Sequence, residues 1–250
     1  MKYVRLLSDG LTRYGILTED QIHLIDTTPF EEFRRTGQVV PLEGAHLLAP
    51  TDFSKAICIG LNYRDHAEEL QLAIPDTPVV FLKPSTTALG PGERIIKPAM
   101  CSRLDYEAEL CIVIKKEAHF VSTEEAFSYI LGYTIANDVT ARDLQPKQGQ
   151  WTVAKGFDTF CPFGPFISDE VDPSNLAIES RVNGELRQSS NTKNLIFTVP
   201  YLVSYLSHVM TLLPGDIILT GTPSGIGPME KGDTVEITIE GLGTLSNPIA

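Results

Sequence analysis

Two glutamates separated by a single residue, Glu107 and Glu109, are of a type and spacing that could do chemistry together. They lie in the segment 104–114 (LDYEAELCIVI), which alternates with a period of two and predicts one continuous strand. Both carboxylates would then share a face, about 6.8 Å apart. They repel unless a proton or a cation lies between them, and Mg²⁺, Mn²⁺ and Ca²⁺ favour oxygen ligands. The alternative is a solvated strand face with alternating charge.

A histidine and a third glutamate, His66 and Glu69, occur where the segment 62–69 can be helical after a short apolar strand at 55–59. Residues three apart lie on one helix face and can touch. A carboxylate beside an imidazole fixes its tautomer, which makes the pair a candidate general base. A surface histidine on a polar helix is the alternative interpretation.

A lysine, Lys155, lies in the segment 150–165 together with the only Trp of the chain, three Phe and two Pro. Apolar surroundings can depress the pKa of a lysine or aim its ammonium at an anion. A salt-bridged surface lysine is the alternative. The apolar, proline-rich part at 157–166 is long for an exposed loop, and such a patch is typical of a contact between subunits.

The composition limits the class of protein. The chain has 250 residues, 42% of them hydrophobic, and a net charge of −12. This charge argues against a nucleic-acid partner and an anionic membrane surface. The four cysteines show no Cys-x-x-Cys spacing, and neither a signal peptide nor an apolar run of membrane-spanning length is visible, so we expect a cytoplasmic protein.

The pattern of strands and turns predicts a β-rich α+β protein with a small N-terminal domain at 1–50 and a larger domain at 51–250. Short helices are predicted at 28–35, 122–130 and 198–213 from their start and stop signals. The dipeptide Asn183-Gly184 predicts a β-hairpin.

Six motifs in one order resemble the fumarylacetoacetate hydrolase family over residues 52–250. They are GLNYRDH at 60–66, FLKP at 81–84, DYEAEL at 105–110, GYTIANDVTARDLQ at 132–145, AKGFDTFCPFGP at 154–165 and TGTPSGIG at 220–227. The resemblance implies a catalytic domain of mixed β-sheets in a rolled, barrel-like arrangement with few short helices, usually as a homodimer.

The resemblance also implies the roles of particular residues. A Mg²⁺ or Mn²⁺ site would be made by Glu107, Glu109 and Asp138, and Lys155 would contact the substrate or its enolate. In the acylpyruvase branch of the family, the substrate site would be lined by Arg142, Gln145 and Thr222, and a mobile lid would carry His66 and Glu69.

One departure from the family pattern bears on the substrate. The mammalian enzyme that names the family has a fourth, aspartate metal ligand seven residues before its histidine, and here that position is Ile59. This disfavours fumarylacetoacetate itself. The chain is more similar to the acylpyruvases and to the isomerase/decarboxylases of the homoprotocatechuate pathway.

The expected reaction is metal-dependent hydrolysis of a C–C bond in an acylpyruvate or a related β-diketo acid. The metal would chelate the 2-oxo carboxylate and stabilise an enolate, while His66, polarised by Glu69, would take a proton from water. The alternatives are decarboxylation of oxaloacetate and isomerisation/decarboxylation of a 2-hydroxyhepta-2,4-diene-1,7-dioate-type acid, because both use the same enolate without that water. A third possibility, from another class, is a metal-stabilised binding protein without turnover.

Overall fold

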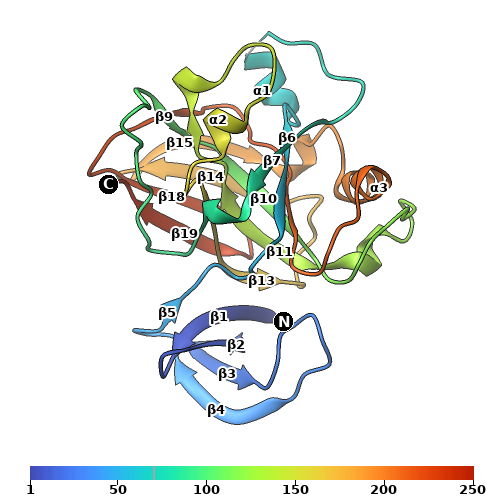
Figure 1. Cartoon of the computed structure of the whole chain (residues 1–250), viewed down its shortest axis with the longest axis vertical. Coiled ribbons are helices and arrows are strands. Elements are labelled where there is room, and N and C mark those ends of the chain that lie inside the picture. Colours follow the sequence, from blue (N-terminus) through green and yellow to red (C-terminus); the bar gives the residue numbers. More distant parts are fainter. Residues whose placement is uncertain (70) are drawn as a thin grey trace.

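The computed structural model describes residues 1–69 and 71–250, and these residues form three β-sheets with three short α-helices (Figure 1). The predicted β-rich α+β class of mixed sheets with few short helices is confirmed. None of the helices in the described part of the chain is long and apolar enough to cross a membrane.

The largest sheet is mixed and open. Its neighbours along the path are β4 (Arg35–Pro41), β3 (Gln21–Ile25), β2 (Leu11–Thr18), β1 (Lys2–Ser8), β13 (Cys161–Ser168), β11 (Ile130–Asn137), β10 (Ala108–Ile114), β16 (Ile217–Leu219), β6 (Lys55–Gly60) and β7 (Val79–Pro84). Off this path, β5 (His46–Leu47) pairs with β1 and β8 (Ala88–Leu89) with β13. Pairing is antiparallel along the path except between β16 and β6. Within the described residues, the two ends of the path are not paired with each other, so the sheet rolls without closing into a barrel.

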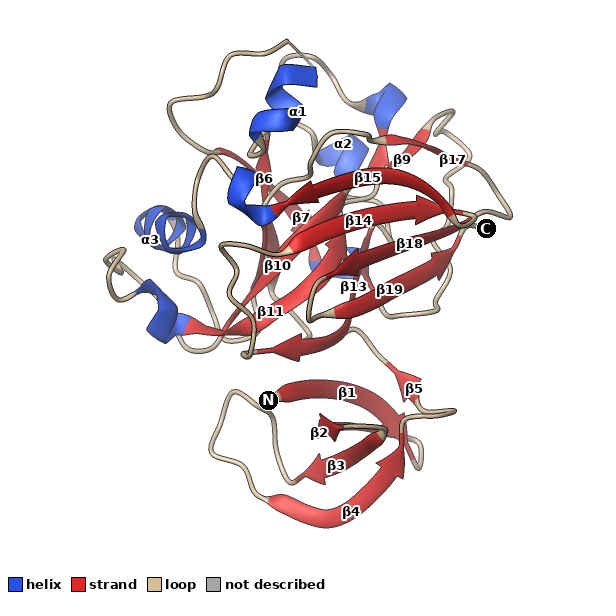
Figure 2. Cartoon of the chain, turned by 180° about the vertical axis from the view of Figure 1, so that it is seen from behind, coloured by secondary structure: helices blue, strands red, loops and turns tan. Residues whose placement is uncertain are grey.

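Two smaller sheets complete the larger part of the molecule (Figure 2). One orders β12 (Thr140–Ala141), β9 (Leu104–Tyr106) and β17 (Gly227–Met229), and the other orders β15 (Glu185–Asn191), β14 (Ala177–Val182), β18 (Thr234–Ile239) and β19 (Gly243–Pro248). The predicted hairpin joins β14 to β15, with Asn183 and Gly184 both at positive φ as a two-residue hairpin turn requires. The main core includes Ile112 and Ile135 from the large sheet and Ile178 and Ile237 from the four-stranded sheet.

Strands β1 to β5 form a small N-terminal unit, seen at the bottom of Figure 1. A separate apolar cluster fills it, which includes Leu6, Ile22 and Phe166. Strand β1 also pairs with β13, so this unit shares the large sheet with the rest of the chain. The domain boundary at residue 50 stays a prediction.

The predicted helices differ in outcome. The segment 28–35 is not a helix but turns that lead into β4, with Phe30 and Phe33 packed on the core, so burial of these rings outweighs the helix start signal. At 122–130 the capping contacts between Ser122 and Glu125 form, but only a 3₁₀ turn follows, Ala126–Tyr129. Helix α3 (Val199–Val209) matches most of the third prediction and begins with Pro200 in its first turn.

Two further predictions, of one strand at 104–114 and of an exposed loop at 157–166, were wrong. The segment 104–114 is not one strand, because β9 and β10 belong to different sheets and the chain changes direction at Glu107. Instead of a ladder partner, the N–H of Glu107 donates to Asn137 Oδ1 at 3.0 Å. The segment 157–166 is not an exposed loop either: it leads into β13, which is mostly buried in the middle of the large sheet, so it gives no argument for a dimer.

Candidate active site

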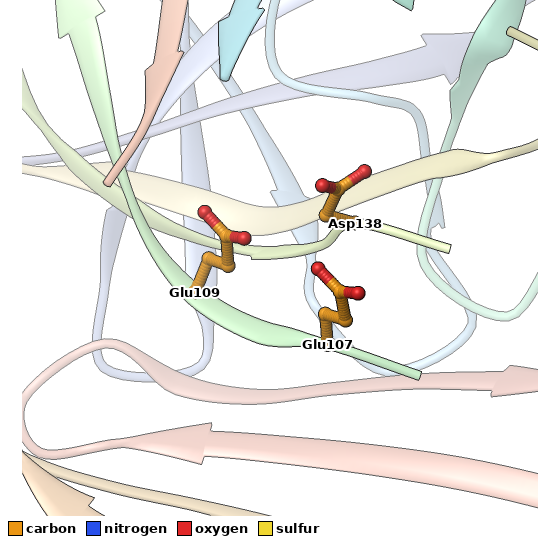
Figure 3. Close-up of side chains that lie close together, drawn as sticks. All are labelled: Glu107, Glu109 and Asp138. Carbon is orange, nitrogen blue, oxygen red and sulfur yellow. The ribbon is translucent and has the colours of Figure 1, made fainter. Parts of the chain in front are cut away.

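Three carboxylates from neighbouring strand ends converge in the interior (Figure 3). Glu107 lies between β9 and β10, Glu109 lies on β10, and Asp138 follows β11 directly. The pairing of β10 with β11 brings Asp138 beside Glu107, whose carbonyl accepts the Asp138 N–H at 2.9 Å. One oxygen from each carboxylate lies within 4.8 Å of the others, and all three side chains are buried. The alternative interpretation of Glu107 and Glu109, as charges on a solvated strand face, is therefore excluded.

Lys155 provides a cation for two of these carboxylates. It ends the short helix α2 (Thr152–Lys155), and its Nζ donates to Glu107 Oε2 at 2.9 Å and to Asp138 Oδ2 at 2.6 Å. Burial alone would lower the pKa of Lys155, but the charges of Asp138 and Glu107 raise it above the ordinary value. The side chain is thus held as an ammonium, and its depressed-pKa interpretation is wrong.

A second buried lysine, Lys83 on β7, also contacts the carboxylate cluster. Its Nζ donates to the carbonyls of Val139 at 2.9 Å and Phe160 at 2.5 Å, and it forms an ion pair with Asp138 Oδ1 at 2.5 Å. The residue was not predicted as part of the site. The signal that could have identified it is a lysine within an apolar strand, since a buried ammonium requires partners.

Replacement of Lys83 with methionine is expected to destabilise the metal-free protein by about 3–5 kcal/mol, because the buried Asp138 loses a counter-charge. Denaturant titration measures this change in the free energy of unfolding. Lys231→Met, at an exposed lysine, is the matched control and should change it by less than about 0.5 kcal/mol. A loss below about 1 kcal/mol in Lys83→Met would show that Asp138 does not depend on this lysine.

Arg142 orients the carboxylate side of the site. Its Nε donates to Asp105 Oδ2 at 2.9 Å, its Nη2 donates to Glu107 Oε1, and its Nη1 donates to Gln145 Oε1 at 2.5 Å. Each of its three nitrogens therefore has a protein acceptor. Arg142 and Gln145 both line the cavity as predicted residues of the substrate site, but the contacts of Arg142 are those of a positioning residue.

The electrostatics differ among the carboxylates. Burial alone would raise the pKa of Glu107, yet Lys155 and Arg142 lower it below its usual range. Burial raises the pKa of Glu109 well above its usual range, and the charges of Asp138 and Glu107 add to this, although the Gly221 N–H donates to its Oε2 at 2.6 Å. The surroundings of Glu109 thus favour its neutral form.

This donor set fits a hard divalent cation. Glu107, Glu109 and Asp138 offer only oxygen ligands, and a cation among them would remove the repulsion that raises the pKa of Glu109. The ammonium of Lys155 already shows that positive charge is favourable at Glu107 and Asp138.

The predicted His66–Glu69 contact forms on helix α1 (Arg64–Glu69). His66 Nδ1 lies 3.0 Å from Glu69 Oε2, and the His66 side chain is buried. A carboxylate at Nδ1 accepts a hydrogen bond from the Nδ1–H and so leaves Nε2 with its lone pair. The helix is tied to the rest of the molecule because the Gly225 N–H donates to Glu69 Oε1 at 3.1 Å and Ser190 Oγ donates to Asp65 Oδ2 at 2.5 Å. The mobility of this segment as a lid stays a prediction.

A cavity of about 690 Å³ joins these groups. The predicted residues that line it are His66, Glu107, Glu109, Asp138, Arg142, Gln145, Lys155 and Thr222, while Glu69 contacts it through His66. The remaining wall is mainly apolar and includes Ile59, Phe81 and Trp151. Sequence reasoning also missed Gln188, a buried residue of β15 whose Nε2 donates to Thr222 Oγ1 at 2.8 Å.

Comparison with known proteins identifies the fold and its relatives. The family model described as "Fumarylacetoacetate (FAA) hydrolase C-terminal" matches residues 55–250. The chain belongs to the fumarylacetoacetate hydrolase family. A second family model, "Rv2993c-like, N-terminal", matches residues 1–50.

Proteins similar to this chain are named after different reactions. Oxaloacetate tautomerase YisK of Bacillus subtilis (strain 168) is 46% identical over 218 residues, which cover 82% of this chain and 72% of that protein. The crystal structure of 5-carboxymethyl-2-hydroxymuconate delta-isomerase from Mycobacterium smegmatis is 46% identical with a TM-score of 0.94, covering 100% of this chain and 99% of that one. Maleylpyruvate hydrolase from Sphingobium sp. SYK-6, in complex with manganese (II) ion and pyruvate, is 30% identical with a TM-score of 0.83 and the same coverage. Tautomerase, isomerase and hydrolase thus occur among the similar proteins of this enzyme family.

Proposed function

We propose that this member of the fumarylacetoacetate hydrolase family is a divalent-metal-dependent enzyme that moves a proton at C3 of a small 2-oxo dicarboxylate, interconverting the keto and enol forms of oxaloacetate. The observation that carries the proposal is one cavity lined by both a buried carboxylate cluster and a histidine with a carboxylate partner. The name of the 46% identical tautomerase supports the choice of reaction and substrate.

Mg²⁺ or Mn²⁺, held by Glu107, Glu109 and Asp138, would supply a Lewis acid that polarises the keto group. The manganese in the maleylpyruvate hydrolase structure makes Mn²⁺ a candidate alongside Mg²⁺.

His66, Lys155 and Thr222 have separate roles in the proposed proton transfer. His66, with Nδ1 directed to Glu69, takes the C3 proton at Nε2, and the C–H electron pair becomes the C2–C3 double bond. Negative charge then develops on the C2 oxygen, and the ammonium of Lys155 contributes positive charge to the cavity for it. Protonation of that oxygen from solvent completes the enol, while the imidazolium of His66 returns its proton to solvent, and the reverse order returns the keto acid. The hydroxyl of Thr222 lines the same cavity and is a further substrate contact in this proposal.

Hydrolysis of a C–C bond in an acylpyruvate or related β-diketo acid is the second candidate function. Its support is the same histidine pair, because a base that takes a proton from carbon can also take one from water. The name of the 30% identical maleylpyruvate hydrolase supports it as well. Decarboxylation of oxaloacetate is a third outcome at the same site, since loss of CO₂ from C4 leaves the enolate of pyruvate without removal of a proton by a base.

A panel of substrates tests these assignments. Enol-oxaloacetate loss, oxaloacetate decarboxylation, acetylpyruvate hydrolysis and turnover of a hydroxymuconate-type diacid would be measured with Mg²⁺, with Mn²⁺ and with chelator. We expect tautomerisation to exceed the other reactions in kcat/KM by about tenfold or more and to be lost with chelator. Faster hydrolysis of acetylpyruvate would overturn the tautomerase proposal in favour of the second candidate, and activity that survives the chelator would overturn the role of the metal.

We further propose a homodimer in the cytoplasm, with no nucleic-acid or membrane partner. The resemblance to the family supports the dimer, and the net charge of −12 supports the absence of a nucleic-acid or anionic-membrane partner. Analytical ultracentrifugation at micromolar protein should give twice the chain mass of 27.5 kDa.

A further inference from the structure

Three cations line the cavity within the described residues, and they differ in their partners. Lys155 and Arg142 are both engaged by the buried carboxylates. Lys147 is exposed and forms no ion pair with any residue of 1–69 or 71–250. It is therefore a positive charge at the cavity whose partner is not supplied by the described chain.

The segment that carries Lys147 is anchored on both sides of this residue. At one end, Gln145 accepts a hydrogen bond from Arg142. At the other end, Trp151 packs edge-on against Phe81, with ring centroids 5.1 Å apart, and lies directly on Gly60. A Cβ at Gly60 would come within 2.8 Å of the indole ring, so the missing side chain is what allows this contact. The exposed residues 146–150 lie between these anchors, and Pro146 and Lys147 line the cavity.

The cavity thus has two ends of different character. The buried end holds the carboxylate cluster. Glu107, Asp138 and the adjoining Asp105 form ion pairs with four cations (Lys83, Arg103, Arg142 and Lys155), whereas Glu109 forms none with the described residues. A divalent cation added there would make this end positive and would favour the carboxylate of a 2-oxo acid. The wall that includes Ile59, Phe81 and Trp151 is apolar, and the exposed end offers Lys147.

We propose that Lys147 is a specificity-determining residue that binds the distal carboxylate of a 2-oxo dicarboxylate, and so selects dicarboxylic over monocarboxylic 2-oxo acids. The inference rests on the proposed function for the orientation of the substrate, with its 2-oxo carboxylate at the buried end. An ammonium on a flexible stem suits this task, because it acts as a point charge and adapts to carboxylates at slightly different distances.

A matched pair of ligands tests the proposal. Oxaloacetate and 2-oxobutanoate share the 2-oxo carboxylate and a four-carbon chain, but 2-oxobutanoate has a methyl group in place of the second carboxylate. Calorimetry on the Mg²⁺-loaded protein would give the Kd of each ligand for the wild type, Lys147→Met and Lys147→Arg. Lys231→Met, at an exposed lysine that does not line the cavity, is the control.

We expect Lys147→Met to weaken oxaloacetate binding about three- to tenfold and to leave 2-oxobutanoate binding unchanged. Lys147→Arg should restore most of the difference, and added salt should reduce it in the wild type, because the ion pair lies at an exposed position. In turnover of oxaloacetate, Lys147→Met should raise KM with little change in kcat.

An equal effect of Lys147→Met on both ligands, or an effect on neither, would overturn the proposal. Failure of the proposed function is a separate result: the wild type would bind oxaloacetate without tautomerising it. The two dissociation constants would then still decide whether Lys147 recognises the second carboxylate.

Discussion

Replacement of Glu109 with glutamine is expected to lower the affinity of the protein for Mg²⁺ and Mn²⁺ by at least about a hundredfold, more than the loss typical of residues that only support a metal ligand. The amide keeps the size of the side chain but removes one of the three carboxylates that converge in the interior. Metal-dependent turnover should fall in parallel at subsaturating metal. Calorimetric titration of the metal-free protein measures the affinity directly.

The fold is expected to survive this change. Burial raises the pKa of Glu109 in the metal-free protein, so the folded state favours the neutral carboxyl, whose charge resembles that of the amide. The midpoint of metal-free unfolding in Glu109→Gln should therefore equal or exceed that of the wild type above the ordinary pKa of a glutamate. Glu124→Gln, at an exposed glutamate, is the control and should change neither property. Unchanged metal affinity in Glu109→Gln would remove Glu109 from the site.

The raised pKa of Glu109 predicts that the stability of the metal-free protein depends on pH. The pKa of Glu109 is raised in the folded state, so its protonated form contributes to the free energy of unfolding of the metal-free protein. This contribution is fully present below the unfolded pKa, near 4.5, and is lost as the pH rises through the folded value. Glu107 acts in the opposite sense, since its pKa is lowered and its contribution is lost as the pH falls below about 4.5. Because a metal ligand must be deprotonated, metal binding at a pH below the raised pKa of Glu109 should release a proton from the wild type, measurable by calorimetry in buffers of different ionisation enthalpy, and Glu109→Gln should release less.

The spacing of Glu107 and Glu109 was enough to predict that their carboxylates lie together, but not the path of the backbone between them. Period-two alternation treats the segment as one strand, whereas the chain leaves one sheet and enters another at Glu107. That change depends on Asn137, which accepts the Glu107 N–H from a different strand, and a local pattern contains no such information. The resemblance supplied Asp138, which lies 29 positions from Glu109 in the sequence and next to it in space.

The misjudged elements share a cause. Lys83 was not recognised as a site residue, and the segment 157–166 was interpreted from its own composition. The surroundings of both are determined by distant partners. A lysine in an apolar strand is stable there only because Asp138 and two carbonyl groups satisfy it. Phe163 and its neighbours in β13 pack into the core, so their composition gives no argument for an interface. Hairpin and capping signals were reliable where the contacts are local, as at Asn183-Gly184.

Replacement of His66 with alanine is expected to lower the rate of oxaloacetate tautomerisation on the order of 10²–10⁴-fold, the usual contribution of a positioned general base. The imidazole is buried at the cavity, and its Nδ1 is engaged by Glu69, so no solvent-exposed surface role accounts for its position. Glu69→Gln should reproduce the loss in milder form, because it leaves the ring in place but orients and polarises it less well. Metal affinity should be unchanged in both variants, since the three carboxylates come from other elements.

The deciding measurement is the response of the different reactions catalysed at this one site. Tautomerisation and C–C hydrolysis both require a base to remove a proton, from carbon or from water, whereas decarboxylation requires only the stabilised enolate. Any decarboxylation of oxaloacetate should therefore survive His66→Ala far better than the other two reactions. His208→Ala, which replaces an exposed histidine of α3 remote from the cavity lining, is the matched control and should leave all three rates unchanged. If His66→Ala lowers tautomerisation, hydrolysis and decarboxylation equally, the residue supports the site as a whole and is not the base. If hydrolysis alone falls, His66 acts on water, and the proton at C3 is moved by another group.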